Sequence, residues 1–428
     1  MTTIVVQNYT ELKGALVPAN QGATIKVKAG DYNVTEPLVV PDGATLEGEG
    51  RMQAIYAASN WWPGSPQSKL QASPGWEGDI LRLGNGSRIT GLTISDVAGR
   101  KGNLVAVIST ATNDRISATI DRCELINPNS SGALITGPAA GPTGRGLVVL
   151  TLNPLDASPP APHEGAVVSV QMTRSVIRSP GNGSGVFAIN FAPRARVIVR
   201  LSRNMIGGGL DANGGVSRPY PVVGSETVIF SDRNMYQSDG TAAAAPTGWL
   251  LHGGSNAPFA SFVAPFTNGN TLTLKSYRDS ISGFAVGIRA AGGWRPSDPP
   301  GMGTVNFNCA DLELTYLGIT SLAADLVLVG AVSGSPAAPG APRFTPGDDN
   351  HLRVTFNMSG GSSEYGSTTI YANRYQDSAW IDGGTLPQPG SGNSLEVFGD
   401  DQETSLLSVK PQPPADFSRG PAFSTDGP

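Results

Sequence analysis

Short segments in which hydrophobic and polar residues alternate recur along the first 330 residues of the chain. We align six of them on one pattern, in which the alternating residues lead to a turn residue and an apolar residue follows two positions later. They cover residues 118–125, 168–177, 197–206, 227–236, 272–281 and 305–314. Because side chains on a strand alternate between its two faces, each segment predicts a half-buried β-strand that ends in a tight turn.

The turn position of these six segments is mostly small and polar. It holds Cys123, Ser175, Asn204, Asn234, Asp279 and Asp311. Intervals of 29 to 52 residues separate consecutive turn residues, which indicates one basic rung with loops of variable length. Asn and Asp tolerate a left-handed backbone and bond to their own main chain, so stacked turns would form a ladder along a solenoid.

An arginine precedes the turn residue in five of the six segments. These arginines are Arg122, Arg174, Arg203, Arg233 and Arg278. We interpret them as solvated residues beside the ladder, and a binding stripe is the alternative interpretation.

The N-terminal region predicts a cap for such a solenoid. Residues 8–16 form the best short helix candidate, because Leu12, Ala15 and Leu16 lie at helical spacing. Strands are expected over residues 23–32, 38–40 and 44–50, separated by Gly-Asp and Pro-Asp-Gly turns. A helix at this end would cover strand edges and core that would otherwise be exposed.

Composition and charge narrow the classes of partner. Of the 428 residues, 15% are charged and 39% are hydrophobic, which fits short strands and turns better than long surface helices. The net charge is −5, and no run of five Lys or Arg residues occurs, so we expect no nucleic acid partner. No stretch approaches the length of a membrane span, so we expect no membrane partner. The first residues carry no secretory signal.

The C-terminal hundred residues differ from the rest. We expect the β-helix and its cap over residues 1–332, followed by a Pro/Gly/Ala-rich break at 333–346. Residues 347–409 contain further strands, which are either final rungs or a separate small β module. The tail at 410–428 is rich in proline and has no periodicity.

Strand rungs with a small polar turn residue, opened by residues 25–32, resemble the pectin-lyase superfamily of right-handed parallel β-helix proteins. The resemblance covers about residues 1–330 and concerns architecture, because no full catalytic signature is matched. It implies an all-β, single-stranded parallel β-helix with an N-terminal capping helix and a β-rich C-terminal segment. It also implies a groove along the strand that follows the polar turn.

We align this groove strand by its leading glycines, which are Gly185, Gly209, Gly248 and Gly283. The residue after each glycine is apolar and should point inward, so the alternate positions should face solvent. The first outward position then holds Phe187, Asp211, Leu250 and Ala285. The second holds Ile189, Asn213, His252 and Gly287, with Arg289 one step further. Asn213 and His252 should be direct neighbours.

Asp211, His252 and Arg289 are the candidate catalytic residues on this face. A carboxylate beside an imidazole raises its basicity, and an arginine holds a uronate or sulfate oxygen pair. The three residues follow the order of the family's polysaccharide hydrolase motifs, but the Asp pair and the lysine after the arginine are missing. An inverting hydrolase needs two carboxylates, so we disfavour that mechanism. The competing interpretation makes His252 a structural histidine.

Candidate ligand-binding residues lie beside the catalytic candidates. They are Asn213, Trp294, Arg295 and Phe187. We expect Trp294, in the loop after the groove strand, to be a platform for a sugar ring. No cluster of carboxylates indicates a metal site, so we expect no cofactor, although calcium serves the lyase-like members of the family.

Our first functional hypothesis is a homotrimeric spike or fibre protein of a phage or virus-like particle. It would recognise a surface polysaccharide, with or without cleaving it, beside other particle proteins. It would be made in the cytoplasm and leave as part of a released particle. The alternatives are a free-standing bacterial polysaccharide lyase or glycoside hydrolase whose secretion signal was removed, and an intracellular isomerase or cyclase. The last would act on a small apolar substrate, as Phe187, Ile189 and Leu250 suggest.

Overall fold

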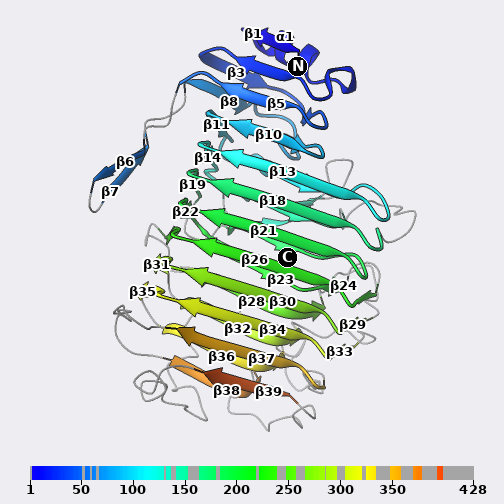
Figure 1. Cartoon of the computed structure of the whole chain (residues 1–428), viewed down its shortest axis with the longest axis vertical. Helices are drawn as coiled ribbons and strands as arrows, with labels where there is room; N and C mark the ends of the chain where they lie inside the picture. Colours follow the sequence, from blue (N-terminus) through cyan, green and yellow to red (C-terminus); the bar gives the residue numbers. More distant parts are fainter. Residues whose placement is uncertain are drawn as a thin grey trace.

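The computed structural model describes residues 2–50, 54–57, 60–63, 67–129, 132–135, 141–152, 163–179, 184–217, 221–238, 247–256, 266–284, 286–295, 304–320, 324–333, 348–357, 370–377 and 393–398. These residues wind into a solenoid of short parallel strands (Figure 1). In Figure 1 the front strands run from right to left, the chain returns behind them, and each turn lies below the last. This sense of winding is right-handed, and the predicted right-handed parallel β-helix is confirmed.

Three parallel sheets run along the solenoid. The first contains β1 (Thr3–Val6), β2 (Thr24–Val27), β5 (Thr45–Gly48), β10 (Ser87–Thr90), β13 (Arg115–Asp121), β18 (Val167–Thr173), β21 (Arg196–Ser202), β26 (Glu226–Asp232), β30 (Thr271–Tyr277), β34 (Cys309–Thr315), β37 (His351–Asn357) and β39 (Ser394–Phe398). The second contains β3 (Gly30–Val34), β8 (Ser68–Ala72), β11 (Leu92–Ser95), β14 (Glu124–Ile126), β19 (Val176–Arg178), β22 (Met205–Gly207), β27 (Met235–Gln237), β31 (Ser280–Ser282) and β35 (Gly318–Thr320).

The third sheet closes each rung on the remaining side. It contains β4 (Leu38–Val40), β9 (Leu81–Leu83), β12 (Val105–Ile108), β17 (Leu147–Leu150), β20 (Ser184–Ile189), β23 (Gly209–Asn213), β28 (Thr247–Asn256), β32 (Val286–Arg295), β36 (Ala324–Ser333) and β38 (Ile370–Asp377), with β24 (Val216–Ser217) paired to β28. Three short strands form a further parallel sheet, namely β25 (Val222–Val223), β29 (Phe266–Asn268) and β33 (Thr304–Asn306). Two antiparallel pairs complete the strands, β6 (Ala54–Ala57) with β7 (Asn60–Pro63) and β15 (Gly132–Ile135) with β16 (Gly141–Thr143).

The predicted capping helix is present at the first rung. Helix α1 (Tyr9–Ala15) begins after Asn8, whose side chain accepts a hydrogen bond from the backbone N–H of Glu11 at 3.0 Å. That contact satisfies one of the free N–H groups of the first turn. Leu12 and Ala15 are buried, so the helix packs its apolar face on the end of the core. A short 3₁₀ helix, η1 (Pro18–Asn20), follows.

The predicted polar ladder stands at the turn between the first and second sheets. The backbone N–H of Cys123 donates to Ser175, that of Ser175 to Asn204, that of Asn204 to Asn234 and that of Asn234 to Asp279. The stacking of Asn204 on Asn234 is therefore confirmed. We expected the ladder residue itself to have the left-handed backbone. In the structure the arginine before it has this backbone instead. Arg203, for example, has φ 57°.

The sixth segment was aligned wrongly. Asp311 lies within β34 opposite Thr273, six residues before the turn. The left-handed residue of this rung is Tyr316, which takes the place that arginine holds in the other five segments, and Leu317 follows it. The rung lacks both the arginine and the polar turn residue. The available signal was Glu313, which stands two positions after Asp311, where the other five segments have an apolar residue.

A second ladder, which sequence reasoning missed, stands at the start of the first-sheet strands. The amide nitrogen of Asn270 donates to Oδ1 of Asn308 at 3.0 Å, and Asn308 donates in the same way to Asn350 at 3.0 Å. Asn350 continues the series to Asn393 at 3.2 Å. Each of these asparagines directly precedes a strand, and that repeated position was the available signal.

The strands after the Pro/Gly/Ala-rich break continue the solenoid. β37 pairs with β34, β39 pairs with β37, and β38 pairs with β36, all in parallel register. The described strands of the C-terminal region are thus further rungs rather than a separate module. β36 itself runs to Ser333 and crosses the boundary expected at residue 332. The break at 334–346 and the tail at 410–428 lie outside the described residues.

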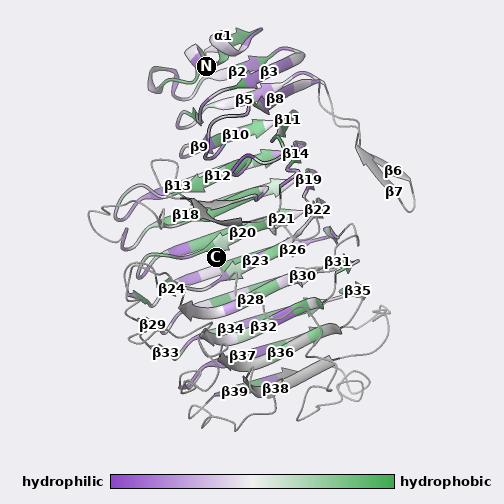
Figure 2. Ribbon diagram, turned by 180° about the vertical axis from the view of Figure 1, so that it is seen from behind, coloured by the Kyte–Doolittle hydropathy of each residue, from purple (hydrophilic) through white to green (hydrophobic). Residues whose placement is uncertain are grey.

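Two apolar clusters occupy different sides of the third sheet. The main cluster fills the inside of the solenoid and includes Leu210, Trp249 and Ile288. A second buried cluster, which includes Phe187 and Phe191, lies on the outer side of the same sheet. Figure 2 shows this sheet from behind, with hydrophobic stretches in β12 and β20. β17 and β23 are therefore buried along their whole length instead of alternating.

No helix in the described part of the chain is long and apolar enough to span a membrane.

Candidate functional site

Strand pairing brings the predicted site residues onto one side of the third sheet. Asp211 pairs with Leu250, and Leu250 pairs with Arg289, so Asp211 and Arg289 lie two rungs apart in one column. Asn213 pairs directly with His252, as predicted. The inward partners in these strands belong to the main core, so this column lies on the outer face.

The glycine alignment was wrong in one strand. Gly287, and not Gly283, occupies the place of Gly248, because Trp249 pairs with Ile288. The shift of four residues preserves the strand parity, so Arg289 still points outward. It moves Arg289 into the column of Phe187 and Asp211.

The predicted solvent exposure of this face is wrong. Asp211 is 9% exposed, Asn213 2%, His252 3% and Arg289 7%. The parity argument assumed that every side chain outside the main core meets water. Here the outer face carries its own buried apolar cluster, so alternate positions are covered as well.

Asp211 lies near a buried arginine that sequence reasoning missed. Arg145 directly precedes Gly146 and β17, outside the aligned strands, so no local pattern marked it. Its guanidinium lies 4.1 Å from the centre of the Phe187 ring. Burial raises the pKa of Asp211 to about 6, although the positive charge of Arg145 opposes that rise. Asp211 therefore gains a proton in mildly acidic solution, while Arg145 stays charged.

His252 is held against an aromatic ring. Its imidazole stacks on Trp294 with 4.7 Å between ring centres and 26° between the planes. Burial, and then the positive charge of Arg289, lower the pKa of His252 to about 3. The imidazole is consequently neutral at physiological pH but a weaker base than an ordinary histidine, so the rise in basicity expected from a neighbouring carboxylate is wrong. On the paired strand, the Asn213 amide donates to the Ser255 hydroxyl at 2.8 Å.

We expected Trp294 to stand in an open loop, and this expectation is wrong. Trp294 belongs to β32, is 7% exposed and packs on His252 instead of facing solvent. The side chain of Arg295 lies outside the described part of the structure. Burial lowers the pKa of Arg289 to about 10, so its charge persists at neutral pH.

The acidic side chains of this face do not form a cage. Among the described residues no group of three His, Cys, Asp or Glu side chains could hold a metal ion. In β12, β17, β20, β23, β28 and β32, Asp211 is the only acidic residue. The arrangement supplies one carboxyl group, one imidazole and two guanidinium groups.

Comparison with known proteins gives only structural neighbours. No protein-family model and no curated protein matches the sequence. One solved structure is a mannuronic acid specific polysaccharide lyase of family 6 from human gut microbiota. It is 12% identical, with 85% of this chain and 89% of that chain covered and a TM-score of 0.32. The catalytic unit of a GH87 α-1,3-glucanase from Streptomyces thermodiastaticus is 16% identical over 95% of this chain and 68% of that chain, with a TM-score of 0.30.

A polysaccharide lyase of family PL6 from Pseudopedobacter saltans is 11% identical over 98% of this chain and 99% of that chain, with a TM-score of 0.28. Similarity at this level carries no argument about the activity of this chain. The parallel β-helix architecture rests on the chain's own strand pairing.

Proposed function

We propose that this protein acts on an extended polysaccharide that contains uronate units, and that the outer face of the third sheet cleaves it by β-elimination. The supporting observation is that Asp211, His252 and Arg289 share this face on three successive strands. Burying charged groups is costly, so a buried cluster of this kind is a candidate functional site.

The residue types suit elimination better than hydrolysis. An inverting hydrolase needs two carboxylates across the scissile bond, and the third-sheet strands β12, β17, β20, β23, β28 and β32 supply only Asp211. Elimination from a uronate instead needs a cation on the carboxylate, an acceptor for the proton on C5 and a donor to the oxygen that leaves C4. Each of these roles has a candidate here.

In the proposed reaction Arg289 pairs with the uronate carboxylate and stabilises the negative charge that develops there. The bound carboxylate also offsets the charge of Arg289, which lowers the pKa of His252 in the free protein. Neutral His252 then accepts the C5 proton as a double bond forms between C4 and C5 and the bond from C4 to oxygen breaks. Asp211, which is protonated below about pH 6, donates its proton to the leaving oxygen. Asn213 and Phe187 would contact the sugar beside these groups.

A substrate can reach this face only if side chains that cover it move. Because Asp211 and His252 are largely buried, a sugar ring must displace groups that pack against them. The His252–Trp294 stack offers a surface of suitable chemistry, because a sugar ring could replace either partner on the other's aromatic face.

The sequence also predicted a more specific role for a polysaccharide-binding β-helix, that of a homotrimeric spike or fibre of a phage or virus-like particle. This role remains a prediction. The intracellular isomerase or cyclase also remains a prediction. The buried apolar cluster around Phe187 favours it, because such a cluster suits a small apolar substrate.

The decisive experiment offers the protein two uronate polymers, polygalacturonate and alginate, and a neutral glucan. Elimination produces an unsaturated uronate, which is followed by ultraviolet absorbance, while reducing ends report any chain cleavage. We expect both signals with at least one uronate polymer and neither with the glucan. Reducing ends without the absorbance would indicate a hydrolase. Absence of both signals with both uronate polymers would refute the proposed reaction.

A further inference from the structure

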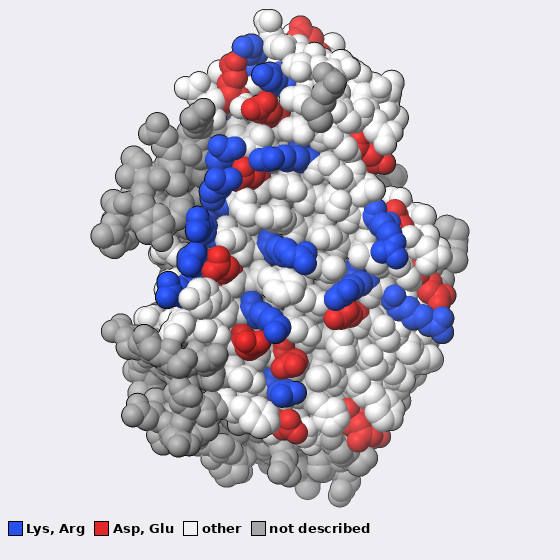
Figure 3. Space-filling view, viewed as in Figure 1, with Lys and Arg blue, Asp and Glu red and all other residues white. Residues whose placement is uncertain are grey.

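A column of arginines follows the exposed edge where the first-sheet strands end. The left-handed residues of six successive rungs form it, with φ between 49° and 57°. Five of them are the arginines Arg122, Arg174, Arg203, Arg233 and Arg278, and Tyr316 holds the sixth position. Figure 3 shows basic side chains gathered along this edge, down the left side of the view.

The spacing of the column is fixed by the backbone. The N–H of Arg174 donates to the carbonyl of Ser202 on the next rung at 3.1 Å, and that of Arg203 donates to Asp232 at 2.9 Å. The polar ladder lies directly beside these residues and locks the same turns. Neighbouring arginines therefore start about 4.8 Å apart, the distance between paired strands.

Arginine is a costly choice at these positions. A left-handed backbone disfavours residues with a long side chain, whereas Gly, Asn or Asp would adopt it more easily. Five arginines at equivalent strained positions therefore call for a reason beyond folding, and strain of this kind is often kept at functional sites.

The two halves of the column differ in charge. At the upper end Asp121 binds Arg88, Arg122 and Arg174, with nitrogen–oxygen distances of 3.1, 3.1 and 2.8 Å. Lower down, Arg203 and Arg278 have no carboxylate within 4.0 Å among the described residues. Arg233, which stands between them, lies 3.9 Å from Asp232, so the least compensated charges of the column are those of Arg203 and Arg278.

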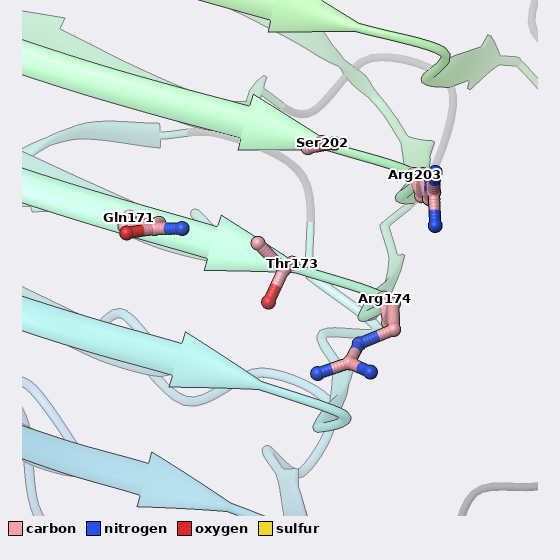
Figure 4. Close-up of a pocket in the computed structure, with 5 residues that line it drawn as sticks. All are labelled: Gln171, Thr173, Arg174, Ser202 and Arg203. Atoms are coloured by element: carbon pink, nitrogen blue, oxygen red, sulfur yellow. The ribbon is translucent and has the colours of Figure 1, made fainter.

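The column borders a cavity between Arg174 and Arg203. Gln171, Thr173, Arg174, Ser202 and Arg203 line a cavity of about 250 Å³. Figure 4 shows the two arginines at the turns where the strands end. Thr173 and Arg174 already donate to Asp121, and Ser202 donates to Asp232. Gln171 and Arg203 are therefore the lining side chains that offer hydrogen bonds to a ligand.

The lower end of the column has an aromatic flank. The Arg278 guanidinium lies 5.1 Å from the centre of the Tyr277 ring and 5.6 Å from that of Tyr316. The two tyrosine rings lie 5.8 Å apart, edge to face. Aromatic rings of this kind can pack against the apolar face of a sugar.

From this geometry we infer a second binding site, distinct from the outer face of the third sheet, for a linear anionic glycan that runs along the arginine column. A sugar unit of an extended chain advances by about one rung spacing, so successive carboxylate or sulfate groups would meet successive arginines. Arginine holds such groups with two parallel hydrogen bonds. The inference does not depend on the proposed elimination reaction.

Dextran sulfate is the best first probe, because it carries sulfates but no uronate and cannot undergo β-elimination. Its affinity is measured by calorimetry for the intact protein and for the double variant Arg203→Gln/Arg278→Gln. We expect the double variant to raise Kd at least tenfold, since each lost charge-assisted contact weakens binding by roughly that factor. Neutral dextran should not bind.

The matched control is Arg194→Gln/Arg196→Gln. Both arginines are exposed and lie at the opposite end of the first-sheet strands, and Arg194 shares the left-handed backbone with φ 53°. Unlike Arg203 and Arg278, they pair with carboxylates, those of Glu164 and Glu226. This variant changes the net charge equally and should leave Kd unchanged. An equal loss in the control would show that binding follows net charge and would overturn the inference. Equal affinity for single-stranded oligothymidylate would overturn it in favour of a nucleic acid site, and no binding of dextran sulfate would overturn it outright.

Discussion

Asn204 donates two hydrogen bonds to a single atom of Asn234. Its backbone N–H and its side-chain amide both reach Oδ1 of Asn234, each at 2.9 Å. Asn234 in turn donates from its backbone and its side chain to Oδ1 of Asp279, at 2.7 and 3.1 Å. Each rung thus satisfies buried donors of its neighbour, and the turns are locked to one register.

Replacing Asn234 by alanine should destabilise the protein. The change leaves the backbone N–H of Asn204 without its acceptor in a buried turn. The Asn204 amide loses one of its two acceptors and keeps the carbonyl of Met172. One unsatisfied buried group costs about 1–3 kcal/mol, so the free energy of unfolding should fall by at least that amount. Thermal denaturation followed by circular dichroism measures the effect. Asn33→Ala, at an exposed strand position, is the control and should change little.

Asp279 should make the stability of the protein depend on pH. Burial raises its pKa to about 6, against about 3.9 in the unfolded chain. The folded state then holds the proton more tightly, so stability is full below about pH 4 and is lost as the pH rises to 6. The loss could reach about 3 kcal/mol.

Asp279→Asn removes this titration and turns the end of the ladder into another amide. Its stability should therefore fall less than that of the wild type between pH 4 and 7. The control Asp31→Asn changes an exposed carboxylate. Parallel stability profiles for wild type and Asp279→Asn would contradict the raised pKa.

Asp211 should control the pH dependence of the proposed elimination. If it donates the proton to the leaving oxygen, the rate falls as the pH rises above about 6, because the acid form is lost. Asp211→Asn should abolish turnover. It should not destabilise the protein at pH 7, because a carboxyl group whose folded pKa is raised costs stability when ionised. Steady-state rates and melting temperatures together test both statements; full turnover in the variant would remove Asp211 from the mechanism.

The trimer is tested by light scattering on the full-length protein. A spike should have three times the chain mass of 44.1 kDa at micromolar concentration. Truncation near Ser333 is a poor test, because it removes β37, β38 and β39, which pair with earlier rungs. A monomer would favour the free-standing enzyme.

The sequence by itself determined the rungs, the cap and the polar ladder from Cys123 to Asp279. These features depend on local rules: alternation along a strand, helical spacing in residues 8–16 and turn residues at one repeated position. The same rules placed Asp211, His252 and Arg289 on one face of the third sheet, because strand parity survives an alignment error of an even number of residues.

The tertiary structure alone decided the burial and surroundings of that face. The outer cluster around Phe187, the approach of Arg145 to Asp211 and the stack of His252 on Trp294 all join residues far apart in sequence or on different rungs. It also decided the register of Tyr316, since loops of variable length separate the rungs. Strand parity fixes which way a side chain points, but what covers it depends on how distant segments pack, and that depends on the whole fold.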